Sequence, residues 1–498
     1  MDPTKTTIVE LRDAIADRQT SAVAAVQAYL ERIDRHDGDL NVFAQTYAER
    51  ALERAALVDA GDLSGPLAGV PLAVKDLLCT QWGRTTCSSR ILEHFRAPYT
   101  ATVVKKLELA GAIILGKTNM DEFAMGSSTE NCAWGVVSNP WDTGRVPGGS
   151  SGGSTAAVCA DFCAGALGTD TGGSIRQPAA LCGVVGMKPT YGRVSRWGLV
   201  AFASSLDQIG PIAHTVADTA LLLSVVSGHD PLDSTCADRP VPDFLAQLDE
   251  PIAKARIGIP SQYLSDTNHP AVTRAIDQAV EVFKEDGHEI VDIEMPHTEY
   301  GIPTYYIVAT AEASSNLARY DGVHYGHRTA EAHDLIAMAC QSRCEGFGDE
   351  VKRRIMLGTY ALSSGYYDAY YLRALKVRRL IKRDFDVAFA AGSDGPGPGP
   401  GAGCDAILCP TTTGPAFAIG AKIDDPLAMY MNDVYTVNAN LAGIPGISLP
   451  AGLAEHEGPA GLPVGIQLYA PGFEETRLLR LAHRFERATD FHKARPPL

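Results

Sequence analysis

The chain has 498 residues, of which 45% are apolar and 20% charged, and its 43 basic residues against 59 acidic residues give a formal net charge of −16. This apolar content argues against disorder, and the acidic balance argues against a protein that binds nucleic acid on its own. No apolar run approaches the roughly 18 residues that span a bilayer, and the first residues lack the apolar core of a signal peptide. These features predict a cytoplasmic globular protein without a membrane partner.

The cysteines number eleven, an odd count, and none of them forms a CxxC pair. Two pairs have helical spacing, Cys159 with Cys163 and Cys340 with Cys344, but neither has a histidine at ligand spacing beside it. Zinc sites need tighter clusters of sulfur and nitrogen ligands, and disulfide frameworks belong to secreted chains. We therefore predict buried, reduced thiols and no metal site.

The predicted elements begin with helices and then alternate between strands and helices. Amphipathic periodicity predicts helices over residues 22–36, with Ser21 as N-cap, and over residues 43–61. Such alternation further along the chain indicates an α/β fold with helices covering a largely parallel or mixed sheet. The predicted strands are residues 69–76, 112–119, 255–261, 288–295, 404–410 and 462–469, and the helices between or after them are 101–111, 270–287 and 474–490.

Two segments near residue 390 have unusual composition. Residues 392–403, GSDGPGPGPGAG, can neither continue a helix nor join a sheet, and we interpret them as a flexible surface loop that is an insertion rather than a binding site. The helix before it is rich in basic residues, which either contact a partner or a nucleic acid or form a solvated face, the alternative that we favour. These basic residues are Arg373, Lys376, Arg378, Arg379, Lys382 and Arg383.

Glycine is concentrated in one region, since nine of the 48 glycines lie within residues 144–173. Two clusters, GGSSGGS at 148–154 and TGGS at 171–174, enclose small apolar residues that suit a tightly packed helix and strand. Neither cluster is followed by the lysine of a phosphate-binding GxxxxGK[ST] loop, and the apolar run argues against a linker. Two interpretations remain, which are a structural turn and a serine nucleophile whose glycine-rich backbone aims N–H groups at an oxyanion.

A serine nucleophile needs a base, and the histidines are poorly placed to supply one. None of the 13 histidines lies between His94 and His214, although a distant histidine could still approach in space. Lys75 is the candidate lysine because it ends an apolar strand, where partial desolvation would lower its pKa. The alternative is an ordinary surface lysine at a strand end.

Lys75, Ser150 and Ser174, with the sequences GGSSGGS and DTGGSIRQPA around the serines, resemble the amidase signature family. The resemblance implies an α/β fold in which a large mixed sheet is sandwiched between helices, formed here by residues 66–498 with an N-terminal helical segment, residues 1–65, packed on it. It also implies that Ser174 is the nucleophile, that Ser150 relays the proton and that Lys75 is the base. The peptide bond between Gly149 and Ser150 is expected to be cis. The backbone N–H groups of Thr171, Gly172, Gly173 and Ser174 would form the oxyanion hole.

Four further blocks resemble one branch of this family, the glutamine-hydrolysing subunits of tRNA-dependent amidotransferases, and they lie at residues 119–131, 191–212, 312–326 and 353–374. The resemblance implies that the chain hydrolyses glutamine and supplies ammonia for protein biosynthesis. In a heterotrimer, a tRNA- and ATP-binding B subunit would use ATP and Mg²⁺ to amidate Glu-tRNA(Gln) or Asp-tRNA(Asn), beside a small C subunit. This chain itself would need no cofactor. The alternatives are a stand-alone amidase for another small or aryl amide and a non-catalytic scaffold.

Glutamine carries an α-carboxylate and an α-ammonium, so its pocket needs a cation and an anion beside the amide site. By resemblance, Arg354 would bind the carboxylate, Asp433 would bind the ammonium, and Tyr305 would line the same pocket. Taken alone, the two charged residues fit ordinary helix-surface charges better than a binding site, and only the matching blocks favour the pocket. Leu77 stands where the family commonly has Asn, a difference that concerns loop details rather than catalysis.

Overall fold

A computed structural model describes residues 1–389 and 403–498 and contains one sheet with the strand order β1-β3-β2-β4-β6-β5-β10-β11-β9-β7-β8 in that part of the chain. The sheet is mixed, because β2 pairs in parallel with β3 and β4 whereas β10 pairs antiparallel with β5 and β11. The mixed α/β sheet predicted from the sequence is therefore confirmed. The strands are β1 (Phe43–Thr46), β2 (Pro71–Lys75), β3 (Ile113–Thr118), β4 (Gly165–Thr169), β5 (Val185–Lys188), β6 (Ile209–Ala213), β7 (Arg256–Pro260), β8 (Glu289–Ile293), β9 (Ala406–Pro410), β10 (Gly446–Ala454) and β11 (Leu462–Tyr469).

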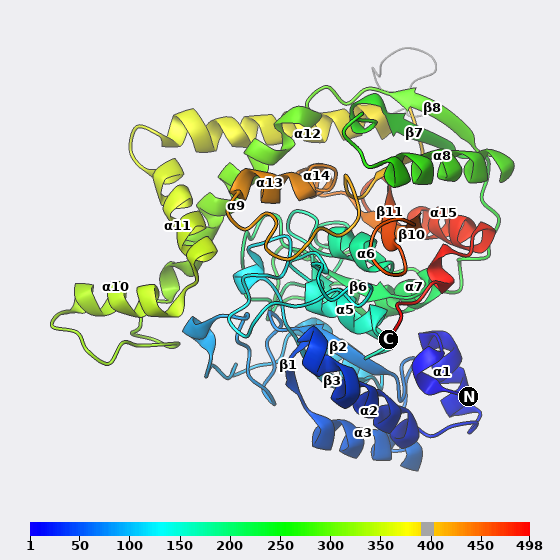
Figure 1. The fold of residues 1–498 in the computed structure, drawn as a ribbon, viewed down its shortest axis with the longest axis horizontal. Coiled ribbons are helices and arrows are strands. Elements are labelled where there is room, and N and C mark those ends of the chain that lie inside the picture. Colours follow the sequence, from blue (N-terminus) through cyan, green and yellow to red (C-terminus); the bar gives the residue numbers. More distant parts are fainter. Residues whose placement is uncertain (390–402) are drawn as a thin grey trace.

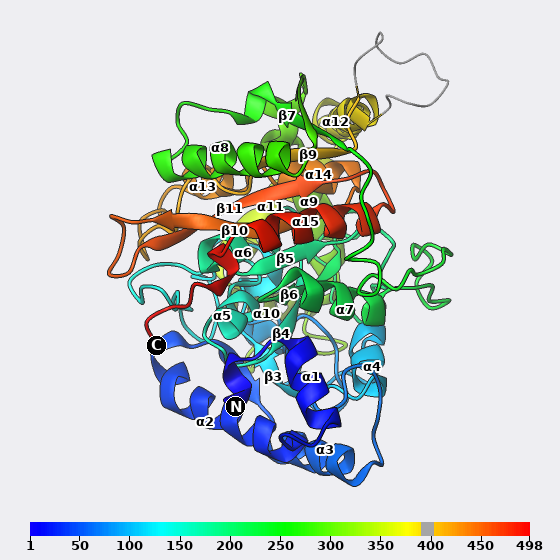
Figure 2. The same cartoon turned by 90° about the vertical axis from the view of Figure 1, so that its right-hand side faces the viewer.

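Helices cover the sheet on both sides, with α7, α8 and α15 on the right in Figure 1 and α9 and α11 on the left. Figure 2, turned by 90°, places α8, α15 and α7 in front of the strands. The helices are α1 (Ile8–Ala16), α2 (Ala22–Leu40), α3 (Ala48–Ala60), α4 (Thr102–Leu109), α5 (Gly152–Cys159), α6 (Arg176–Cys182), α7 (Val216–Val226), α8 (Pro270–Glu285), α9 (Gly301–Asn316), α10 (Leu335–Gly346), α11 (Asp349–Leu362), α12 (Arg373–Phe389), α13 (Pro426–Tyr430), α14 (Val437–Ala442) and α15 (Glu475–Ala488).

The N-terminal region contains one wrong prediction. The helix predicted from residue 22 is confirmed as α2, and the Ser21 hydroxyl accepts a hydrogen bond from the N–H of Ala24 at 3.0 Å. The helix predicted over 43–61 begins only at Ala48, because β1 precedes it and pairs antiparallel with β3. Pairing with a strand some 70 residues away overrides the local helical pattern. The division into residues 1–65 and 66–498 stays a prediction.

Most other predicted elements are confirmed. The six predicted strands are β2, β3, β7, β8, β9 and β11, and the three helices are α4, α8 and α15. The helix and strand predicted between the two glycine clusters are α5 and β4. The predicted loop at 392–403 lies outside the described residues except for Gly403. Within the ranges that are described, no helix combines the length and apolar character that crossing a membrane requires.

Two surface predictions are correct only in part. Nine of the eleven cysteines are buried, but Cys340 and Cys344 are exposed on α10, so the prediction of buried thiols is wrong for these two. Five of the six basic residues on α12 are exposed, as a solvated face requires. Arg378 differs, because its guanidinium donates to the carbonyl of Leu441 at 2.9 Å and to the hydroxyl of Ser205 at 2.7 Å. Its role is to pack α12 against the rest of the chain.

Candidate active site

The first part of the site is formed where two neighbouring parallel strands end. Lys75 is the last residue of β2 and Thr169 the last of β4, so parallel pairing brings both to the same edge of the sheet. The Lys75 ammonium donates hydrogen bonds to the hydroxyls of Ser150 at 2.8 Å, Ser151 at 2.9 Å and Thr169 at 2.9 Å. Lys75 is 0% exposed, so the alternative of a surface lysine is wrong.

The surroundings of Lys75 favour its neutral form. Burial lowers the pKa of Lys75 to about 7, although the more distant carboxylates of Asp121, Asp170 and Asp207 act in the opposite direction. Within the described ranges, no carboxylate forms an ion pair with Lys75, and its hydrogen-bond partners are three hydroxyls. A buried amine with this pKa can take up and return a proton near neutral pH.

The serines of the first glycine cluster lie directly before and at the start of α5. The peptide bond between Gly149 and Ser150 is cis, as the resemblance implies. Gly149 has no space for a side chain, since a Cβ atom there would lie 2.0 Å from Oδ2 of Asp121. The Ser151 hydroxyl donates to the carbonyl of Thr169 at 3.0 Å and accepts from its N–H at 3.1 Å. Ser151 therefore joins the start of α5 to the end of β4.

The second glycine cluster forms the loop between β4 and α6. In the described part of the chain, no acceptor receives a hydrogen bond from the backbone N–H groups of residues 171–174, and none binds the Ser174 hydroxyl. The loop is fixed by a buried ion pair between Asp170 and Arg176 at 2.9 Å and by the Thr171 hydroxyl, which donates to Asp207 at 2.8 Å. Buried N–H groups without acceptors are rare, and here they suit a developing oxyanion.

The structure also brings Ser174 to the lysine cluster, through the backbone. The carbonyl of Ser174 accepts from the N–H of Ser151 at 3.1 Å, and Ser174 is only 6% exposed. The three residues predicted as a triad thus lie in one buried cluster. The hydrogen bond that would relay a proton from the Ser174 hydroxyl to Ser150 is absent from the structure.

Tyr305 and Asp433 pack against the same loop. A Cβ atom at Gly172 would lie 2.6 Å from the Tyr305 ring, and one at Gly173 would lie 3.1 Å from Oδ1 of Asp433. Oδ2 of Asp433 accepts from the Ser127 hydroxyl, but the buried Oδ1 has no hydrogen-bond partner among residues 1–389 and 403–498. Burial raises the pKa of Asp433 to about 7. An unpartnered carboxylate oxygen beside the loop is suited to a cationic group of a ligand.

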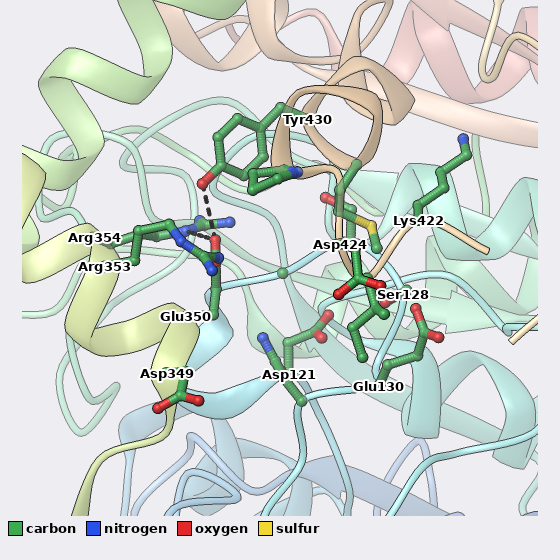
Figure 3. Close-up of a pocket in the computed structure, with 16 residues that line it drawn as sticks. Asp121, Ser128, Glu130, Asp349, Glu350, Arg353, Arg354, Lys422, Asp424 and Tyr430 are labelled. Carbon is green, nitrogen blue, oxygen red and sulfur yellow. Dashed lines mark hydrogen bonds and ion pairs between the residues drawn. The ribbon is translucent and has the colours of Figure 1, made fainter. Parts of the chain in front are cut away.

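Arg354 lies on α11 and is 2% exposed, so neither it nor the 5% exposed Asp433 is a surface charge. Arg354 borders a cavity of about 330 Å³ (Figure 3). Ser127, whose hydroxyl donates to Asp433, lines the same cavity. Lys75, Ser150 and Ser174 do not line this cavity, but Asp121 does, and its backbone N–H donates to the carbonyl of Ser150 at 3.3 Å, so the cavity lies beside the lysine cluster. The charged residues that line it are Asp121, Glu130, Asp349, Glu350, Arg353, Arg354, Lys422 and Asp424.

Sequence reasoning missed several residues of this region. Ser151 lies within the GGSSGGS cluster, so its nearness to Ser150 is a signal for it, whereas Thr169 becomes visible only through the pairing of β2 with β4. Glu350, four residues before Arg354, has the spacing of a helical ion pair. No group of three or more His, Cys, Asp or Glu within residues 1–389 and 403–498 is placed to hold a metal ion.

Comparisons with known proteins show what the whole chain is similar to. The family model described as Amidase matches residues 24–479. The A subunit of glutamyl-tRNA(Gln) amidotransferase from Syntrophobacter fumaroxidans is 56% identical, over 100% of this chain and 99% of that relative. The crystal structure of the A subunit of this enzyme from Thermotoga maritima is 40% identical with a TM-score of 0.78, covering 98% of this chain and 96% of that one. A peptide amidase from Stenotrophomonas maltophilia is 31% identical with a TM-score of 0.80, covering 99% and 98%.

Proposed function

The chain belongs to the amidase family, and on that premise we propose that it is the glutamine-hydrolysing subunit of a tRNA-dependent amidotransferase. The observation that carries the chemistry is the Lys75 ammonium, buried and bonded to three hydroxyls, with a pKa of about 7. The observation that supports the branch is the 56% identity over the full chain to a subunit of this name.

In the proposed mechanism, neutral Lys75 removes a proton from Ser174 through the hydroxyl of Ser150. The Ser174 oxygen then attacks the side-chain amide carbon of glutamine, and the N–H groups of residues 171–174 stabilise the oxyanion. When the C–N bond breaks, protonated Lys75 returns the proton to the leaving nitrogen, which departs as ammonia. Water, activated by the same lysine, hydrolyses the acyl-serine to glutamate.

Two buried charges of opposite sign provide the basis for substrate selection. Arg354 would bind the α-carboxylate of glutamine, and the unpartnered Oδ1 of Asp433 would bind its α-ammonium. Tyr305 packs on the loop beside Asp433 and would form one wall of the pocket. A stand-alone amidase for simple amides has no use for this pair of charges.

The ammonia would be used in a complex rather than released. The relatives are named as a subunit of an amidotransferase, which supports a multisubunit assembly for this chain. We propose a B subunit that binds tRNA and ATP with Mg²⁺, a small C subunit, a cytoplasmic location, and misacylated Glu-tRNA(Gln) or Asp-tRNA(Asn) as the acceptor. Nothing in the proposed chemistry requires a cofactor in this chain.

Ammonia release from glutamine and from benzamide tests this function, measured on the full-length chain with and without the partner subunits. We expect glutamine to be the preferred substrate and Ser174→Ala to lose at least about a thousandfold in rate. Ser364→Ala, at an exposed serine that contacts none of these groups, is the matched control. Preference for benzamide, unaffected by the partners, would favour the stand-alone amidase instead. Unchanged transamidation in Ser174→Ala would favour a scaffold.

A further inference from the structure

Glu350 joins two residues that border the cavity beside the lysine cluster. Its Oε1 atom accepts a hydrogen bond from Nε of Arg354 at 2.8 Å and another from the hydroxyl of Tyr430 at 3.0 Å. Its other oxygen pairs with the partly exposed Arg353. Figure 3 shows Glu350 between α11 and α13, with both bonds converging on one carboxylate.

The position of this carboxylate decides which edge of the Arg354 guanidinium stays free. A guanidinium has five N–H groups in a planar fork, and Glu350 occupies the one on Nε. In the described part of the chain, no acceptor receives a hydrogen bond from Nη1 or Nη2 of Arg354. The two free nitrogens form the edge that binds a carboxylate in bidentate fashion.

Aromatic rings confine the same guanidinium. Its central carbon lies 5.2 Å from the ring centre of Tyr306, 5.3 Å from that of Tyr430 and 5.8 Å from that of Phe202. The rings of Tyr306 and Tyr430 stack on each other at 3.7 Å. The rings restrict the position of the guanidinium, and the hydrogen bond that its Nε donates to Glu350 fixes its rotation within that position.

We propose that Glu350 is the positioning residue for substrate binding, holding Arg354 by Nε so that the Nη edge faces the α-carboxylate of glutamine, while Tyr430 holds Glu350. The inference rests on the proposed function and deepens it. The negative charge of Glu350 repels a carboxylate of the substrate, so Glu350 contributes by orienting Arg354 and not by attracting the substrate. A neutral residue with an oxygen acceptor in the same place should therefore serve as well.

This reasoning distinguishes two variants of one residue. Glu350→Gln keeps an oxygen that can accept from both Arg354 and Tyr430, whereas Glu350→Ala removes the acceptor. The full-length chain is assayed for hydrolysis of glutamine and of butyramide, a primary amide that has no carboxylate for Arg354 to bind. Lys352→Ala, on the same helix and paired with Asp349 at the surface, is the matched control.

For glutamine, we expect Glu350→Ala to raise KM about tenfold or more with kcat reduced less than about threefold. The KM of Glu350→Gln for glutamine should stay within about threefold of that of the original chain, and Tyr430→Phe should raise KM by about two- to fivefold. For butyramide, kcat/KM should stay within about twofold in all of them. If Glu350→Ala fails to fold, the KM of Tyr430→Phe for glutamine tests the proposal instead.

Three results would overturn the proposal. One is an unchanged KM for glutamine in Glu350→Ala and Tyr430→Phe, and another is an equal loss in Glu350→Gln and Glu350→Ala. The third is a parallel loss on glutamine and butyramide, which would mark a purely structural role. Failure of the unsubstituted chain to hydrolyse glutamine would instead contradict the proposed function itself, and it is seen before any variant is made.

Discussion

Two lysines on neighbouring strands are equally buried and differ in their partners. Lys75 on β2 and Lys117 on β3 are both 0% exposed, and residue 74 pairs with residue 117 across the two parallel strands. The Lys117 ammonium forms an ion pair with Asp76 at 3.0 Å and also donates to the carbonyl of Arg84 at 3.2 Å. Within the described ranges, the Lys75 ammonium donates hydrogen bonds to hydroxyls only.

The difference teaches what turns a buried lysine into a base. A carboxylate compensates the desolvation of the Lys117 ammonium, whereas hydroxyls do so poorly for Lys75, and burial lowers its pKa to about 7. Lys188 on β5 adds a third case, because burial lowers its pKa to about 7 as well. Its ammonium donates to the carbonyl of Pro189 at 3.0 Å and, in the part of the chain that the structure describes, to no hydroxyl. A low pKa alone therefore does not set Lys75 apart, and what distinguishes it is the set of hydroxyls that it contacts.

The largest effect is expected at Lys75. Lys75→Ala removes the base and should lower kcat for glutamine by about a thousandfold, within the range of general-base catalysis. The measurement is ammonia release under saturating glutamine, with circular dichroism to verify the fold. A rate near that of the original chain would refute the role of Lys75 and with it the contrast to Lys117.

Removing the carboxylate beside Lys117 should affect stability rather than chemistry. Asp76→Ala leaves a buried ammonium without its ion-pair partner and should lower the free energy of unfolding by about 3–5 kcal/mol, measured in urea. In the double variant with Lys117→Met, no charge is left unpaired, and part of this loss should be recovered. An Asp76→Ala protein as stable as the original would mean that the ion pair is not what makes burial of Lys117 tolerable.

The pH dependence follows from the same contrast. Because neutral Lys75 is the active form and its pKa is about 7, kcat should rise about tenfold per pH unit well below 7 and level off above it. Asp433, whose pKa burial also raises to about 7, must be ionised to bind an ammonium, so kcat/KM should rise more steeply than kcat. A kcat that is flat or falls between pH 6 and 8 would contradict the assignment of the base.

The smallest effect is expected at Lys188, the buried lysine without a hydroxyl partner. Lys188→Met removes an ammonium that has one carbonyl acceptor and should change the rate with glutamine by less than about twofold and stability by about 1 kcal/mol or less. Thermal unfolding and the glutaminase assay check both values. A large loss of activity would show that Lys188, and not only Lys75, takes part in the chemistry.

Local patterns predicted most elements, including strands with a distant partner such as β9 beside β7, and they failed at β1, where the pairing and not the local pattern decides the structure. The strand–helix–strand runs around β2, β3, β7 and β8 follow from buried apolar segments and amphipathic periodicity. Residues 43–46 carry no strand signal of that kind, and pairing with β3 makes them β1. Seven strands could be predicted, β4 between the glycine clusters included, but their order in the sheet could not, since it depends on packing across the whole chain.

The residues of the candidate site also divide into those that the sequence predicts and those that only the fold reveals. The glycine-rich motifs point to Ser150 and Ser174 because oxyanion chemistry needs a backbone without side chains, and the resemblance adds Arg354 and Asp433. Taken alone, Arg354 and Asp433 suggest ordinary surface charges, but both side chains are buried in the structure. Tyr430 could not be predicted, because its contact with Glu350 joins two helices that are far apart in the sequence.

The complete enclosure of Lys75 has a consequence for the product. A lysine that is 0% exposed exchanges protons through its hydroxyl neighbours and not directly with bulk water. Under the proposed mechanism, the proton that Ser174 loses is the one that the leaving nitrogen gains, so acylation neither takes a proton from solvent nor releases one. The nitrogen then leaves as uncharged NH₃, which keeps the lone pair needed to attack an activated carboxylate in a partner subunit.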